Sequence, residues 1–479
     1  MDPNSPQIIV FPMTVEHVQE AVRFAVRHNL CVSVAGTGHD FINRHSCDGD
    51  GLMIRTTLLK GATWDLNDAR WKGGSVTVGA GMTFSEISAE AAQKKRVIAQ
   101  GWGITVGVVG WSLGGGHGPF SESLGLGADN ILEAELVMAD GRRLIANADE
   151  NRDLWWALRG GGGSTWGVVT SLTLRAHILP EKAKLVQAYQ NFGGSACPGS
   201  AEAFDASVDA IVPWLATLDA RESTIVFFTP AASDDPEHCG ATWSTTLVMN
   251  YIGQDTDTEF LELTGGIVRF VDEIVSEGHA VIVAEGLRSY DDQWQRAKEY
   301  PLEEIWPFHS PWSPSSGTPG GVASTLVARD VVASGALSDL IKARLHDCMT
   351  RASDDPMRTC QRQELYADIT GNKNAPQETD VSIPPSMRSA LLHFVFGQWD
   401  SSRLQEYYRL GNHSYVNESA FLIGKELDRT SSSSSSSWKE RLFGDKYPTL
   451  LKIKQRYDPQ GIFWCRHCIG DDEPLTSTS

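Results

Sequence analysis

The first third of the chain contains three glycine-rich segments whose backbone could bind an anionic group. They lie at residues 36–40, 101–118 and 160–163, and their neighbours are mostly apolar rather than the serines of a flexible linker. Glycine allows positive φ and lets backbone N–H groups approach a ligand closely, and successive N–H groups form an anion-binding nest. One such segment alone is as readily an ordinary tight turn. Three of them together favour a binding site for a cofactor that carries a pyrophosphate.

None of these segments has the spacing of a standard nucleotide-binding motif. The GxGxxG motif fails at Phe41, which stands where the third glycine belongs, and GxxxxGK[ST] does not occur in the chain. We therefore expect neither a Rossmann domain nor a P-loop. The glycines would have to bind the cofactor in a backbone arrangement other than these two motifs.

The composition is that of an ordinary folded, globular protein. The 479 residues predict two or three domains at the usual ~150 residues per domain. The chain carries 41 basic and 60 acidic residues, for a net charge of −19. An acidic surface repels phosphate backbones, so we expect no nucleic-acid partner. No apolar run approaches the ~20 residues that span a bilayer, so we expect no membrane partner, and the oligomeric state is left open.

Alternating strands and helices are expected to position the glycine-rich segments. Thr14 should cap a helix whose valines recur at helical spacing, and Thr83 with Glu86 forms a capping box for a second helix. The dipeptide Asp140-Gly141 is typical of the turn in a β-hairpin. Segment 101–118 is too rich in glycine for a helix. The predicted strands are 8–11, 31–34, 52–54, 75–78, 131–138, 143–146 and 171–175.

The character of the chain changes after Pro180, where the glycine clusters end, and this predicts a domain boundary. The following region is predicted to be α+β. The serine run at 431–437 is expected to be a solvated loop, because it has nothing to bury. The predicted strands here are 223–228 and 245–251, and the predicted helices are 258–277, 334–351 and 447–457.

The eight cysteines predict neither a disulfide framework nor a metal site, since eight are few for so long a chain. Cys465 and Cys468 have the CxxC spacing of a metal or redox site, yet zinc needs two further ligands and no second CxxC exists. We interpret them as free or structural thiols. The residues His45, Asp48 and Asp50 have no ligand pattern and are expected to form a polar turn. No metal site is expected.

The glycine-rich segments belong to an ordered set of motifs that resembles a known family. The FAD-binding domain of the vanillyl-alcohol oxidase/PCMH flavoproteins has similar segments in the same order as VAGTGHD (34–40), TVG (105–107), GGGHGP (114–119), LGLGADN (124–130) and LWWALRGGGGSTWGVVTSLT (154–173). Further on, YVNE (415–418) and YDP (457–459) resemble the C-terminal segment of the berberine-bridge-enzyme-like branch. Within that branch the chain most resembles fungal FAD-linked oxidases of secondary metabolism, including isoamyl alcohol oxidases.

This resemblance implies an α+β protein with a two-domain PCMH-type FAD-binding fold and an inserted α+β substrate domain. It implies an FAD-binding domain at 1–180 and a substrate-binding domain at 181–405. A berberine-bridge-like segment at 406–479 would return to the FAD domain. The substrate region contains no motif, so the sequence does not name the substrate.

The resemblance also implies that His39 carries FAD covalently through the 8α-methyl carbon, a bond that a neutral imidazole nitrogen can form. Many relatives add a second link through the cysteine of a CPTVG segment. This chain has Gly103 at that position, so a single covalent bond is expected. The other cofactor-binding residues that the family's motifs imply are Gly36, Thr37, Gly38, Asp40, Thr105, Val106, Gly107, Gly110, Gly114, Gly115, Gly116, Gly118, Val169 and Asn417.

Tyr415 is the candidate catalytic residue. In such oxidations a hydride leaves a C–H of the substrate while a base takes the proton from its O–H or N–H. Tyr415 could be this base if a cation or hydrogen bond lowered its ordinary pKa of about 10, and it could equally pack on the flavin or orient the substrate. Asn417 is expected to hydrogen-bond the flavin or the adjacent backbone, and His117 is interpreted as a loop residue.

Val106 matches a position that in relatives influences how dioxygen reaches the flavin, and a small residue there suits an oxidase. The resemblance thus implies an FAD-dependent oxidase that dehydrogenates a small organic substrate of secondary metabolism, with an alcohol as the first candidate. The electrons would pass to O₂ and form H₂O₂. The alternatives are a flavoprotein cyclase of natural-product biosynthesis, oxidative or redox-neutral, and a catalytically silent flavoprotein that binds a small molecule.

The location of the protein is open at this stage. Relatives usually carry a signal peptide, which implies a secretory or extracellular protein. The chain begins MDPNSPQIIV, without the basic n-region and apolar h-region of a signal peptide. A cytoplasmic protein is the alternative.

Overall fold

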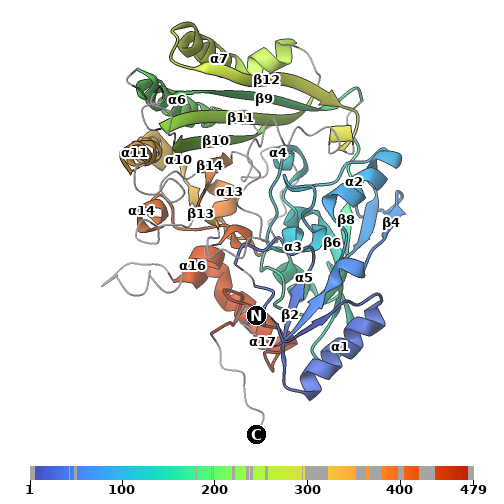
Figure 1. The fold of residues 1–479 in the computed structure, drawn as a ribbon. Coiled ribbons are helices and arrows are strands. Elements are labelled where there is room, and N and C mark those ends of the chain that lie inside the picture. The colour runs from blue at the N-terminus through green and yellow to red at the C-terminus, as the bar shows by residue number, and fades with distance from the viewer. Residues whose placement is uncertain are drawn as a thin grey trace.

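The computed structural model of the chain contains three β-sheets and helices that pack against them (Figure 1). In the part of the chain that is described, no helix is both long and apolar enough to cross a membrane. Asp48, Asp50 and most of the predicted serine loop lie outside the described residues. The description covers residues 6–472 except 43, 48–50, 180, 196, 198, 218–221, 233–236, 238–240, 254–256, 294, 297–321, 352–362, 367–379, 398–403 and 420–436.

A three-stranded parallel sheet opens the fold and leads into the first glycine-rich segment. Helix α1 (Val15–Arg27) packs against this sheet and buries Val18 and Val22, which lie four residues apart on one face. Thr14 caps the helix as predicted, since its hydroxyl accepts a hydrogen bond from the His17 N–H. In spatial order the strands are β1 (Ile8–Val10), β3 (Gly51–Arg55) and β2 (Cys31–Ala35).

A five-stranded antiparallel sheet follows, and the third glycine-rich segment precedes one of its central strands. The predicted hairpin at 131–146 is confirmed, and its turn contains Gly141, whose φ of 77° favours glycine. The sequence analysis misses the first strand, because its four residues alternate between half-buried and exposed. In spatial order the strands are β4 (Ala62–Asp65), β5 (Ser75–Gly79), β8 (Val168–Arg175), β6 (Ile131–Val137) and β7 (Arg143–Asn147).

The second glycine-rich segment contains a helix, which corrects the prediction that 101–118 is too rich in glycine for one. Helix α3 (Val108–Leu113) begins directly after Gly107 and buries Val108 and Leu113. The prediction is wrong because glycines are counted over the whole segment, whereas the helix itself contains only Gly110. One glycine costs a helix roughly 1 kcal/mol relative to alanine, which burial of the apolar side chains can offset.

The other helices of this part are short, apart from the one that begins with the predicted capping box. That box is confirmed: the Thr83 hydroxyl accepts from the Glu86 N–H, and the Glu86 carboxylate accepts from the Thr83 N–H. The elements are η2 (Thr56–Leu58), α2 (Phe84–Gln93), α4 (Ser121–Leu124), η3 (Ala128–Asn130) and α5 (Arg152–Leu158).

A seven-stranded antiparallel sheet forms most of the region after residue 180, with helices α6, α7 and α11 along it in Figure 1. The helices are α6 (Ser200–Leu215), α7 (Asp257–Ser276), α10 (Arg329–Ala333) and α11 (Ala336–Arg351). In spatial order the strands are β12 (Val281–Tyr290), β9 (Lys184–Ser195), β11 (Ala241–Gly253), β10 (Glu222–Ala232), β14 (Gln363–Tyr366), β15 (Leu392–Gly397) and β13 (Val322–Val327).

The two faces of this sheet have different partners, because successive side chains of a strand alternate between faces. Phe228 of β10 packs edge-on against Phe204 of α6, on the helix-covered face. Phe227 belongs instead to an apolar cluster that includes Trp102, from the second glycine-rich segment. The seven-stranded sheet thus covers the part of the chain that carries the glycine-rich segments.

The C-terminal segment returns to the first sheet. The Val32 N–H donates to the Ile462 carbonyl at 2.8 Å, and the Trp464 N–H donates to the Val32 carbonyl at 3.2 Å. Figure 1 shows the last helix beside α5. The described helices from residue 386 onward are α13 (Ser386–Ser389), α14 (Leu404–Tyr408), η7 (Val416–Glu418), α16 (Trp438–Phe443), η8 (Gly444–Lys446) and α17 (Tyr447–Tyr457).

Two disulfides whose residues are both described lie near the two ends of the chain. Cys31 is bonded to Cys47, which closes the loop that follows β2. Cys465 is bonded to Cys468, so of the two interpretations of this CxxC, free or structural, the free thiols are wrong. The chain turns there, with the Cys468 N–H donating to the Cys465 carbonyl at 3.2 Å, which brings the two side chains together. Both sulfur atoms lie against the Gly163 carbonyl of the third glycine-rich segment.

Candidate active site

A cavity of about 590 Å³ lies between the glycine-rich segments and the seven-stranded sheet. This volume is within the range of roughly 300–1,000 Å³ that is typical of small-molecule sites. One wall comes from residues within 34–41, 101–113 and 163–169. The residues that complete the cavity include Val395 of β15 and Tyr415, just before η7. The cavity therefore has one wall from the first third of the chain and another from its last quarter.

Three glycines of the wall leave room that the protein itself does not fill. A Cβ at Gly36 or Gly163 would come no closer than 3.7 Å to the surrounding protein atoms, and one at Gly110 would meet nothing within 4 Å. Packing within the chain therefore does not require glycine at these positions. All three line the cavity, so the missing side chains give a ligand direct access to the backbone. These residues fit a cofactor that lies against main-chain N–H groups.

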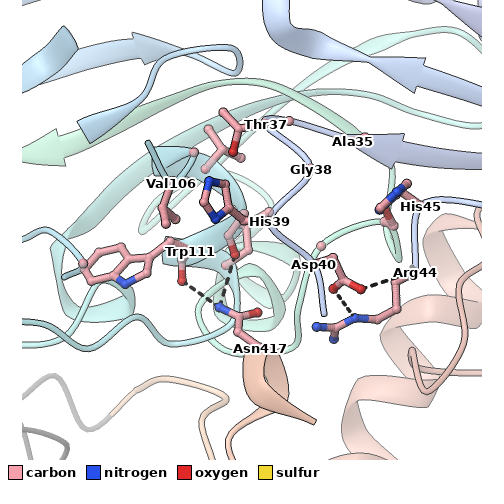
Figure 2. A pocket seen from close by; sticks show the side chains of 18 of the residues that line it. Ala35, Thr37, Gly38, His39, Asp40, Arg44, His45, Val106, Trp111 and Asn417 are labelled. Carbon is pink, nitrogen blue, oxygen red and sulfur yellow. Dashed lines mark hydrogen bonds and ion pairs between the residues drawn. The ribbon is translucent and has the colours of Figure 1, made fainter. Parts of the chain in front are cut away.

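His39 reaches into the cavity from the loop after β2 (Figure 2). Its Nε2 lies 3.0 Å from the hydroxyl oxygen of Thr105. Burial lowers the pKa of His39 from its ordinary value of 6.5, so the imidazole is neutral at pH 7. A neutral imidazole has a lone pair on one ring nitrogen, and this is the form that can bond to an electrophilic carbon. The surroundings of His39 thus meet the chemical condition for a covalent link to a cofactor.

The loop that carries His39 is held by its neighbour Asp40. The Asp40 carboxylate accepts hydrogen bonds from the backbone N–H groups of Ile42 and Arg44 and pairs with the Arg44 guanidinium at 2.6 Å, as Figure 2 shows in part. Burial alone would raise the pKa of Asp40, but the charge and hydrogen bonds of Arg44 outweigh it and hold that pKa below its ordinary value. Asp40 is therefore ionised and fixes the turn from which His39 projects.

Tyr415 and Asn417 meet beside the second glycine-rich segment, where both line the cavity. The Tyr415 hydroxyl oxygen accepts hydrogen bonds from the Gly116 N–H at 3.0 Å and from the Asn417 Nδ2 at 2.8 Å. Asn417 Nδ2 also donates to the Trp111 carbonyl at 3.2 Å, so it ties Tyr415 to helix α3 (Figure 2). Burial raises the pKa of Tyr415, and the nearby Glu418 adds to this. The lowered pKa that the base hypothesis required is therefore not found in this structure.

The structure brings most, but not all, of the predicted cofactor residues to the cavity. Those that line it are Gly36, Thr37, Gly38, His39, Asp40, Val106, Gly107, Gly110, Val169 and Asn417. Thr105 does not line the cavity itself but contacts His39, which does. Four of the predicted residues do not line the cavity: Gly114, Gly115, Gly116 and Gly118. Packing within the chain restricts the side chain at such a position, since a Cβ at Gly118 would lie 1.9 Å from the Gln100 carbonyl oxygen. The assignment of these four glycines to the cofactor stays a prediction.

Alanine in place of Gly114 is expected to push Asn417 away from Tyr415. The new Cβ would lie 2.2 Å from Asn417 Oδ1, whereas the φ of −88° at Gly114 suits alanine, so the clash is the only new cost. We expect the free energy of unfolding to fall by about 1–3 kcal/mol, the usual cost of overpacking. Chemical denaturation measures it.

The matched background for this test is Asn417→Ala, which removes the side chain that collides. In that background Gly114→Ala should lower the free energy of unfolding by less than about 1 kcal/mol, because the side chain with which the new Cβ collides is gone. An equal cost in both backgrounds would show that the contact with Asn417 is not the cause.

The sequence analysis misses a cluster beside Tyr415. His117, interpreted as a loop residue, does lie in a loop, but its buried ring packs edge-on against the Tyr415 ring at 5.2 Å. His393 of β15 and Glu418 of η7 lie next to it and are given no role by any motif. No local pattern could reveal this cluster, since its three members come from distant parts of the chain.

Comparison with known proteins agrees with this geometry. Residues 6–147 match the family described as FAD binding domain, and residues 414–470 match the one described as Berberine and berberine like. The FAD-linked oxidoreductase ffsJ of Aspergillus flavipes is 28% identical, over 98% of this chain and 77% of that protein. The chain is an FAD-linked oxidoreductase of the VAO type. The recognition of the family and of FAD as the cofactor is thereby confirmed.

The fold of this VAO-type flavoprotein is shared with solved structures. MtVAO713 from Myceliophthora thermophila superposes with a TM-score of 0.76 at 20% identity, over 99% of this chain and 82% of that one. The glucooligosaccharide oxidase of Acremonium strictum, whose FAD is 6-S-cysteinyl and 8α-N1-histidyl, superposes with a TM-score of 0.69 at 17% identity, over 98% and 92% of the two chains. The predicted α+β fold class with a PCMH-type FAD-binding fold is confirmed.

Proposed function

We propose that this flavoprotein is an oxidase that takes a hydride from a small organic substrate and passes the electrons to O₂ as H₂O₂. An alcohol of secondary metabolism is the first candidate substrate. The observation that carries the proposal is the cavity, in which a glycine-lined wall and neutral His39 from the first third of the chain meet Tyr415 and Val395 from its last quarter. FAD, when bound, supplies the hydride acceptor. The first wall would hold the cofactor, and the second would hold the substrate.

We further propose that the cofactor is attached through His39 alone. The Acremonium strictum oxidase has both a cysteinyl and a histidyl link. In this chain the position that matches the family's cysteine is Gly103, which lines the cavity and carries no side chain to form a thioether. One bond would therefore replace two, and the space beside Gly103 would be open to a larger substrate.

In this proposal Tyr415 holds the oxygen or nitrogen of the substrate. Its hydroxyl oxygen already accepts two hydrogen bonds, from the Gly116 N–H and Asn417, so its own hydrogen is the group left to donate. Val106 lines the same cavity and would leave room for O₂ beside the cofactor. Residues 1–180 and 406–479 would form the FAD-binding unit, and 181–405 the unit that covers the substrate.

The test is to mix the purified yellow protein with a panel of primary alcohols, amines and phenols. Without oxygen, a true substrate is expected to bleach the flavin absorbance, and admitting O₂ should restore it with about one H₂O₂ per substrate oxidised. A peroxidase-coupled assay measures the peroxide. If a product of unchanged mass forms without peroxide, the protein is a cyclase. If compounds bind tightly and none reduces the flavin, it is a silent binding protein. Either result overturns the oxidase proposal.

A further inference from the structure

Two buried histidines and a glutamate converge at the edge of the cavity. His117 follows α3, His393 lies on β15, and Glu418 ends η7. The side chains of His117 and His393 are 4% and 0% exposed, and the Glu418 carboxylate is 17% exposed. One ligand atom from each residue lies within 4.8 Å of the other two. Three segments far apart in the sequence thus place three metal-type ligands around one point.

The distances in this cluster are those of ligands around an ion. His117 Nε2 lies 3.5 Å from one Glu418 oxygen, and His393 Nε2 lies 3.3 Å from the other. Charge-assisted hydrogen bonds between such groups are shorter, at about 2.7–2.9 Å. Zinc binds nitrogen and oxygen ligands at about 2.0–2.2 Å, so neighbouring ligands of a tetrahedral site lie roughly 3.3–3.6 Å apart.

The chemistry of the three groups is also that of a metal site. Two imidazoles and one carboxylate form the set that holds catalytic zinc with one position left open. The ring of Tyr415 packs edge-on against both histidine rings, at 5.2 and 5.7 Å, and so limits how they can turn.

We propose that His117, His393 and Glu418 bind a divalent transition metal of the zinc type, with its open position facing the cavity. His117 and Glu418 both line that cavity. An ion held there would offer its open position to a lone pair on the oxygen or nitrogen of a substrate and would fix the substrate beside Tyr415. Binding of the ion is independent of the proposed function, whereas this substrate-positioning role rests on it.

The test measures metal binding in the flavin-loaded protein without an affinity tag. Reductant is omitted, so that Cys465 and Cys468 stay bonded to each other and do not compete for the ion. The protein is stripped with a chelator and titrated with Zn²⁺ against a chromophoric chelator, and the bound metal is counted by mass spectrometry. We expect one Zn²⁺ per chain and a raised midpoint of thermal unfolding.

Variants locate the ion. Glu418→Gln and His117→Asn keep similar shapes and should weaken Zn²⁺ binding by about 100-fold or more, since each removes a direct ligand. His346→Asn is the matched control, because His346 is half exposed on α11 and lies outside the cluster. It should bind Zn²⁺ as the wild type does.

Two outcomes would overturn this proposal: a wild-type protein that takes up no stoichiometric Zn²⁺, or uptake that is unchanged in both cluster variants. In the first case, His117, His393 and Glu418 form a buried polar cluster only. Because the readout is metal content, a protein that oxidises no substrate can still confirm the site. Conversely, an active oxidase that takes up no Zn²⁺ would refute the site and leave the proposed function intact.

Discussion

A His39→Ala variant is expected to retain no covalently bound FAD. His39 is the cavity histidine that matches the family's attachment position, and burial keeps its imidazole neutral and able to form the bond. After acid precipitation, the wild-type pellet should be yellow and its band should fluoresce in a denaturing gel. In the variant, all of the flavin should remain in the supernatant.

The control for this experiment is a second histidine of the same cavity. His45 lies in the same loop and lines the same cavity, and burial lowers its pKa as well. A His45→Ala variant should keep its covalent flavin. Flavin released from wild type by acid would contradict the covalent link, and retention in His39→Ala would place the link on another residue.

A Lys454→Met variant is expected to lose about 3–5 kcal/mol of stability, the usual cost of breaking a buried ion pair. Lys454 Nζ donates to the carbonyls of Thr165 and Phe463 and to the Asp458 carboxylate, at 2.6–2.7 Å. The Asp458 side chain is fully buried. Methionine fills a similar volume but leaves that carboxylate without its cation. The free energy of unfolding from chemical denaturation is the measurement.

An exposed lysine provides the comparison for this result. Lys60 pairs with Glu86 at 2.7 Å, but both side chains are more than 40% exposed. Lys60→Met should cost about 1 kcal/mol or less, because water screens the exposed pair. In addition, Asp458→Asn should restore part of the stability of Lys454→Met, since it removes the buried charge. Equal losses at positions 454 and 60 would refute the special role of the buried pair.

The sequence predicts those parts of the site that are local in the chain. The loop of His39 follows β2 directly, so the motif at 34–40 is also a unit of structure, and most of its residues line the cavity. The helix starts at Thr14 and Thr83 are also predictable from local sequence, because an N-cap side chain bonds to a backbone N–H only a few residues away.

The parts that sequence reasoning misses depend on packing between distant segments. Gly114 and Gly118 belong to glycine motifs, but the sequence does not show that packing also restricts them, as Asn417 does beside Gly114. The raised pKa of Tyr415 follows from burial, which no motif records. His393 has no recognisable sequence context at all, and the strand order of the seven-stranded sheet brings it beside His117.

The return of the chain to its first sheet sets the order of events during synthesis. Residues 36–40 leave the ribosome early, but Tyr415 and Asn417 complete the cavity much later, and β2 gains its bonds to 462–464 later still. A nascent chain therefore has only one wall of the cavity for most of its translation. We therefore expect FAD to load late, after nearly the whole polypeptide has left the ribosome. Ribosomes that stall before residue 415 should yield only colourless protein.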